Sequence, residues 1–147
     1  MPPLAQRPTP ALTNLVGIGD ALRLSLSFEP DPRRVAYARR VAGALLRQRE
    51  LSEDTVQTVE LLVSEIVTNA VVHGRGDRVR FLFAYDEAGD VRIEVDDQSR
   101  ACVEVRPLNA EDESGRGMFL VAALARAWGR RGTRTWCTVA TAEVSSP

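Results

Sequence analysis

The sequence predicts a two-layer α+β sandwich, with helices packed on one face of a mixed, mostly antiparallel sheet. Three observations predict it. Several short segments alternate apolar and polar residues, which is typical of half-buried strands. Two longer segments between them have apolar residues at helical spacing. A third helical pattern and a last alternating segment close the chain, so the expected order is β-α-α-β-β-α-β.

Composition narrows the possible functions. The chain has 147 residues, of which 44% are hydrophobic and 27% are charged, and a formal net charge of −1. This length suits one domain with a real core, and the charge gives no indication of direct nucleic-acid or membrane binding. The chain has no lysine, and all its permanently charged basic side chains are arginines, which excludes a mechanism that needs a catalytic or phosphate-binding lysine. No apolar run is expected to cross a bilayer. Cys102 and Cys137 are widely spaced, and we expect a cytoplasmic protein in which both thiols are reduced.

The N-terminal part divides into an arm and a first strand. Residues 1–20 mix Pro, Thr, Asn and Gly without periodicity, which predicts a mostly disordered arm. The alternative is that part of the arm docks on the body or on a partner. Residues 22–28 alternate strictly and predict a half-buried strand. The globular domain is therefore expected over residues 21–140, with a tail at 141–147.

Two helices follow the first strand. Asp31 can cap a helix whose first residue is Pro32. Ser52 is a second cap, followed by acidic residues that suit the positive end of a helix, and Gly74 can end this longer helix. Both boundaries rest on local chemistry.

The C-terminal half is predicted as a hairpin, a helix and a strand. Residues 78–85 and 91–97 alternate on either side of a turn, and a polar connection follows them. The segment 116–129 has a helical pattern, with Met118, Val121, Leu124 and Trp128 on one face and Gly129 past its end. Residues 133–140 predict the closing strand.

Glu65 and Asn69 are the first candidate functional residues. They are four residues apart on the second helix, so their side chains are neighbours at the margin of its apolar stripe, together with His73. A carboxylate and an amide oxygen placed there can hold a hydrated Mg²⁺, and the carboxylate can act as a general base. The alternative is a pair of ordinary solvated helix residues.

Three further features could bind a ligand. Asp97 ends a strand and can accept a hydrogen bond from an exocyclic amino group, although an ordinary turn aspartate has the same pattern. Gly115 and Gly117 flank Arg116 at an expected helix start, where free N–H groups suit phosphate, although a simple entry turn also explains them. The arginine pairs at 33–34, 39–40 and 130–131 are expected to be solvated, or else to dock an acidic partner.

The order of these motifs resembles the histidine-kinase-like ATPase superfamily, which has the Bergerat ATP-binding fold. SEIVTNAVVHG resembles its N box, VDDQS its first glycine-box region, GRGMFLVAALARAWG its second glycine box, and GTRTW its final strand motif. The sequence is most similar to the small, stand-alone anti-sigma-factor type of serine/threonine protein kinase. The resemblance covers roughly residues 22–139.

The resemblance implies a role for each matching position. Asn69 would be the Mg²⁺ ligand, and Glu65 the base that activates the acceptor hydroxyl. Asp97 would bind the adenine amino group, with Ser99 and Thr133 beside the nucleotide. Gly115, Arg116 and Gly117 would hold the phosphates, and residues 100–114 would form a lid over them. The implied ligands are ATP and Mg²⁺, and the implied partners are a sigma factor or an anti-sigma-factor antagonist, with a homodimer also possible.

Two functions remain open at this point. The first is a regulatory ATP-dependent protein kinase. The second is a docking module of the same fold that binds nucleotide weakly or not at all. The superfamily's first glycine box reads D-x-G-x-G, whereas Asp97 is followed here by Gln-Ser-Arg-Ala, which favours the docking module. The Glu65 and Asn69 pair favours the kinase. We expect neither a multidomain ATP hydrolase nor a sensor histidine kinase, because no partner domain or dimerisation helix is recognised.

Overall fold

The computed structural model describes residues 12–18, 21–74, 76–85, 89–98 and 113–141. Its elements follow the order β1 (Leu12–Ile18), β2 (Ala21–Phe28), α1 (Pro32–Gln48), α2 (Glu53–His73), β3 (Val79–Tyr85), β4 (Val91–Asp96), α3 (Glu113–Leu124), β5 (Ala127–Arg131) and β6 (Arg134–Val139). The strands form one sheet in the order β1-β2-β3-β4-β6-β5, and all five pairings are antiparallel. The predicted two-layer α+β class is confirmed.

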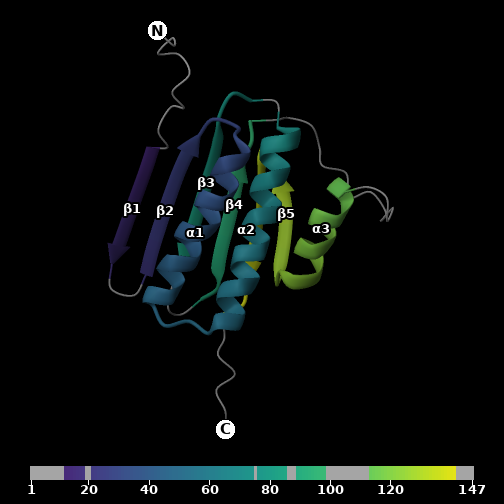
Figure 1. Ribbon diagram of the computed structural model, residues 1–147. Coiled ribbons are helices and arrows are strands. Elements are labelled where there is room, and N and C mark those ends of the chain that lie inside the picture. Colours follow the sequence, from purple (N-terminus) through teal and green to yellow (C-terminus); the bar gives the residue numbers. More distant parts are fainter. Residues whose placement is uncertain (1–11, 19–20, 75, 86–88, 99–112, 142–147) are drawn as a thin grey trace.

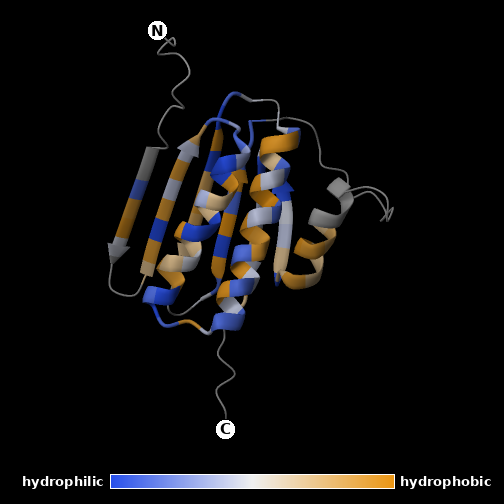
Figure 2. Cartoon of the chain, in the orientation of Figure 1, coloured by the Kyte–Doolittle hydropathy of each residue, from blue (hydrophilic) through white to orange (hydrophobic). Residues whose placement is uncertain are grey.

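The helices lie on one face of this sheet, and no described element covers the other face, which is called the uncovered face below (Figure 1). Helix α2 packs between α1 and α3 and also contacts β3, β4 and β6. Along β2, β3 and β4 the buried side chains alternate with more exposed ones, and the same alternation is visible as orange and blue bands in Figure 2. The buried face of the sheet and the apolar stripes of the helices form the core. On this side of the sheet, polar groups that a ligand could reach are therefore expected at the edges of the core.

Local capping sets the bounds of α1 and α2 as expected. The Asp31 carboxylate accepts a hydrogen bond of 2.9 Å from the backbone N–H of Arg33, and Pro32 is the first residue of α1. The Ser52 hydroxyl accepts one of 3.2 Å from the N–H of Thr55. Both predicted helix starts are therefore confirmed.

Helix α2 is long and apolar enough to cross a membrane by length and composition alone, which the sequence analysis did not expect. Its apolar residues are those of a core helix. The buried side chains recur at helical spacing and pack in the core cluster: Val56, Val59, Leu62, Val63, Ile66, Val67 and Ala70.

Two strands were not predicted. Within residues 1–20, which were expected to be mostly disordered, β1 forms an edge strand in register with β2, from Leu12 opposite Ser27 to Ile18 opposite Ala21. The alternative that part of this arm docks on the body is the correct one for residues 12–18. The helix expected over 116–129 begins at Glu113 and ends at Leu124, and β5 follows it. Trp128 therefore lies in a strand, not on the face of a helix.

Candidate functional site

Glu65 and Asn69 lie one turn apart on α2, as expected. Both are half-buried, while their neighbour Ile66 is only 1% exposed, so the two polar groups lie at the edge of the core face. Neither side chain makes a hydrogen bond or an ion pair in the part of the chain that the structure describes. Polar groups that are partly buried and take no part in holding the fold are available to a ligand. His73, the last residue of α2, is exposed.

The C-terminal end of α2 is packed against the residue that follows β4. A Cβ atom on Gly74 would collide with the carbonyl oxygen of Ala70 and would come within 3.0 Å of the Cβ of Asp97. Glycine is therefore needed here for close packing, and its φ of −67° lies outside the left-handed region. The predicted end of the helix is confirmed, and the same contact brings Asp97 to the end of the helix that carries Glu65 and Asn69.

Among the described residues, Asp97 is the one charged residue that is buried, with 7% of its surface exposed. Its backbone N–H donates to the carbonyl oxygen of Thr133 at 3.2 Å. This bond joins the end of β4 to the β5–β6 turn, in which Gly132 has a φ of 61°. A two-residue hairpin loop favours glycine at such a position. The structure thus brings together two of the predicted positions, Asp97 and Thr133.

The chain turns immediately after Asp97. Gln98 has a φ of 59°, in the left-handed region that favours glycine, and its N–H donates to the Asp96 carboxylate at 2.9 Å. This is the segment where the superfamily's box carries glycines. An aspartate that accepts a local backbone bond helps the chain to turn without one. Ser99, which the resemblance places beside the nucleotide, lies outside the described residues.

Arg130 contacts the candidate site residue Asp97, which the sequence analysis did not expect. Its Nη2 lies 3.3 Å from Asp97 Oδ1, and its Nη1 donates to Asp97 Oδ2 at 3.4 Å and to Thr135 Oγ1 at 3.1 Å. The two charged side chains are 10% and 9% exposed. The prediction of a solvated arginine pair at 130–131 is wrong for Arg130, because β5 turns it toward the helix-covered face, whereas Arg131 is exposed. No sequence signal marked this pair, since β5 itself was not predicted.

The glycine segment lies inside α3. Because the helix begins at Glu113, Gly115, Arg116 and Gly117 occupy its first turns rather than a loop in front of it. The N–H groups of a first turn have no partner within the helix, so this placement still offers backbone donors. Helix α3 packs against α2, which carries Glu65 and Asn69. Most of the predicted lid, residues 100–112, lies outside the described residues.

Of the two cysteines, the structure describes Cys137. Cys137 is a free, fully buried thiol of the core, and burial raises its pKa to about 12. A thiol with so high a pKa is unreactive at neutral pH. Cys102 lies outside the described residues.

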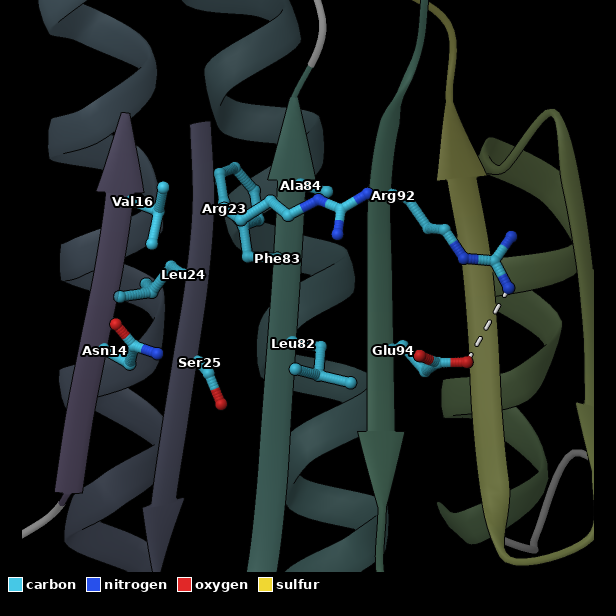
Figure 3. Close-up of a pocket in the computed structure, with 10 residues that line it drawn as sticks. All are labelled: Asn14, Val16, Arg23, Leu24, Ser25, Leu82, Phe83, Ala84, Arg92 and Glu94. Carbon is cyan, nitrogen blue, oxygen red and sulfur yellow. Dashed lines mark ion pairs between the residues drawn. The ribbon is translucent and has the colours of Figure 1, made fainter. Parts of the chain in front are cut away.

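A hollow of about 490 Å³ lies on the uncovered face of the sheet. Figure 3 shows it from that side, with Arg23, Leu82, Arg92 and Glu94 on the strands in front and the helices behind. Arg92 lies 4.8 Å from the centre of the Trp136 ring and forms an ion pair with Glu94 at 3.6 Å. This hollow is separated by the sheet from Asn69 and Asp97, so it is not part of the predicted nucleotide site.

The comparisons with known proteins address the same residues. A family model described as a histidine kinase-like ATPase domain matches residues 28–141. The chain belongs to this family. The match runs from the last residue of β2 to Thr141, and thus includes α2, Asp97, α3 and β5 of the ATPase domain but not β1.

Two curated relatives of this histidine kinase-like ATPase chain are anti-sigma F factors. The protein of Halalkalibacterium halodurans is 28% identical over 85 residues, which cover 56% of this chain and 58% of the relative. The protein of Clostridium botulinum is 26% identical over 86 residues, which cover 56% of this chain and 60% of the relative. The matched part therefore spans less than two thirds of either relative.

Proposed function

We propose that this protein is a cytoplasmic anti-sigma factor that binds ATP with Mg²⁺ and phosphorylates a serine or threonine of an anti-sigma-factor antagonist. The observation that carries the proposal is the pair Glu65 and Asn69, which are half-buried and make no hydrogen bond or ion pair among the described residues, in the half of α2 whose end packs on Asp97. Membership of the ATPase family and the similarity to two anti-sigma F factors support it.

The residues present fit a magnesium ion that is held mainly by phosphates. Mg²⁺ prefers oxygen ligands, keeps several waters, and in nucleotide sites usually takes only one or two protein oxygens. Asn69 offers an amide oxygen, and no group of three or more His, Cys, Asp or Glu side chains that could cage a metal occurs among the described residues. A bound ion would neutralise the charge that develops on the transferred phosphoryl group.

The chain's own residues would bind and orient the reactants. Asn69 would hold the ion through its amide oxygen, and the N–H groups at the start of α3, with Arg116, would hold the phosphates. Asp97 would accept a hydrogen bond from the adenine amino group. Glu65, one turn before Asn69, would accept the proton of the serine or threonine hydroxyl. The hydroxyl oxygen would bond to the γ-phosphorus at the same time, and ADP would leave.

A non-catalytic docking module is the second candidate. The Asp97 carboxylate is already engaged by Arg130, and the segment after it has no glycine. Both features favour a site that takes nucleotide weakly. A docking module would bind its partner protein equally well with and without ATP. A kinase would phosphorylate its partner when ATP is present and then release it.

Glu65→Ala separates the two candidates. The purified protein is incubated with γ-labelled ATP, Mg²⁺ and a purified antagonist protein, and label on the antagonist is measured. We expect transfer by the wild-type protein and a loss of about 100-fold or more in the variant, because a general base contributes typically 10²–10⁴-fold. Nucleotide affinity should remain.

Asp54→Ala is the matched control, since it removes an exposed carboxylate from the first turn of the same helix. It should transfer normally. Normal transfer by Glu65→Ala would remove Glu65 as the base, and no transfer by the wild-type protein to any antagonist would support the docking module instead.

A further inference from the structure

The Asp97–Arg130 pair is held on three sides. Asp97 follows β4 and is bonded through its N–H to Thr133, Arg130 comes from β5, and Thr135 in β6 accepts the third bond of the guanidinium. Thr135 is itself only 6% exposed. A guanidinium that contacts both oxygens of a carboxylate fixes the plane of that carboxylate as well as its position. The direction in which Asp97 presents its oxygens is therefore set before any ligand arrives.

The Asp97–Arg130 pair faces the helix-covered side of the sheet. Other charged side chains lie at this end of the sheet: His73 is exposed at the end of α2, Arg80 pairs with Asp96 across β3 and β4, and the Asp96 carboxylate lies 3.7 Å from Arg134 on the opposite face. Arg130 contacts both oxygens of the Asp97 carboxylate on the helix-covered face and so constrains its geometry. A lysine, which is a point charge without the planar fork, would not hold both oxygens in the same way.

A fixed carboxylate discriminates between purines. An ionised carboxylate only accepts hydrogen bonds, so it binds an exocyclic amino group and repels a carbonyl oxygen at the same position. We propose that Arg130 is a positioning residue that makes this site selective for a purine with an amino group at position 6 over one with a carbonyl there. The inference rests on the proposed nucleotide-binding function, and it adds a determinant of base selectivity from a strand that the sequence analysis missed.

The experiment measures a ratio of affinities. Full-length protein is titrated calorimetrically with ATP and with ITP, each with Mg²⁺; ITP differs from ATP in carrying a carbonyl in place of the amino group. A bond to a charged acceptor gives an expected preference for ATP of about 10- to 100-fold in the wild-type protein. Arg130→Met keeps an unbranched side chain but removes the guanidinium. In this variant the ratio of ATP affinity to ITP affinity should fall to about 1–3, while the ITP affinity stays within about threefold of the wild-type value.

Two milder variants keep the test valid if Arg130→Met does not fold. Arg130→Lys keeps the charge and should give an intermediate ratio. Thr135→Val removes one bond to the guanidinium at nearly constant volume and should lower the ratio by about threefold. Arg131→Met is the matched control, because Arg131 is the exposed neighbour on the same strand, and its ratio should equal that of the wild-type protein.

The outcomes separate the inference from the proposed function. Selective binding of ATP by the wild-type protein and by Arg130→Met to the same degree would overturn the positioning role while leaving the nucleotide site intact. Tighter ATP binding by Arg130→Met than by the wild-type protein would also overturn it, since the guanidinium would then compete with the base. If the wild-type protein binds neither nucleotide, the proposed function fails first and the inference fails with it.

Discussion

The two halves of α2 use their polar residues differently. In the first half, Ser52 caps the helix, and Arg47 of α1 forms ion pairs with Glu53 at 2.7 Å and with Glu60 at 2.9 Å. The hydrogen bond from Arg47 also holds the pKa of Glu53 below its ordinary value. In the second half, Glu65 makes no comparable contact within the described part of the chain.

The difference separates what stabilises the helix from what the helix presents. Exposed ion pairs such as Arg47–Glu53 contribute little individually, but they orient α1 against α2. A half-buried carboxylate or amide without a structural partner has an energetic cost that the fold does not recover. Such groups are expected at functional sites, and Glu65 and Asn69 lie in the half of α2 whose end packs on Asp97.

The apolar stripe is common to both halves, and its disruption should have the largest effect on stability. Ile66→Ala should lower the free energy of unfolding by about 2–5 kcal/mol, because it leaves a cavity in the core. Urea denaturation measures this value. Leu61→Ala, which changes a side chain that is 39% exposed, should cost much less. Equal losses in the two variants would contradict the assignment of the core face.

The cap should have a smaller effect, confined to stability. Ser52→Ala removes the hydroxyl that accepts from the N–H of Thr55 and should cost about 1 kcal/mol. Nucleotide affinity should stay at the wild-type value, because the cap lies at the other end of α2 from Asn69. A large loss of affinity in Ser52→Ala would break the division between a structural half and a binding half.

The sequence predicted the elements whose boundaries depend on neighbouring residues. The start of α1 was predicted from Asp31 with Pro32, and the two ends of α2 from Ser52 and Gly74. The alternation of apolar and polar residues predicted β2, β3 and β4. It also placed Glu65 and Asn69 on one helix face. These features follow from contacts within a few residues of the chain, so a pattern is enough to predict them.

The elements that were missed depend on distant contacts. Helix α3 ends at Leu124 because the chain joins the sheet there: the N–H of Arg126 donates to the carbonyl oxygen of Thr138 at 2.7 Å. Gly129 lies under Trp136, whose ring atoms would be 3.2 Å from a Cβ atom at that position, so its role is packing rather than ending a helix. Since β5 is recognised only through its pairing with β6, Arg130 could not be placed beside Asp97 from the sequence.

The measurement that tests the central claim most directly is calorimetric titration of the full-length protein with a non-hydrolysable ATP analogue, with and without Mg²⁺, in the wild-type protein and in Asn69→Ala. We predict Mg²⁺-dependent binding by the wild-type protein and its loss in Asn69→Ala. The free energy of unfolding of the variant should stay within about 0.5 kcal/mol, because the Asn69 amide has no hydrogen-bond partner among the described residues. Thr68→Ala, which changes the exposed neighbour, should bind normally. Unchanged affinity in Asn69→Ala would refute the metal assignment, and no binding by the wild-type protein at millimolar nucleotide would contradict the nucleotide site altogether.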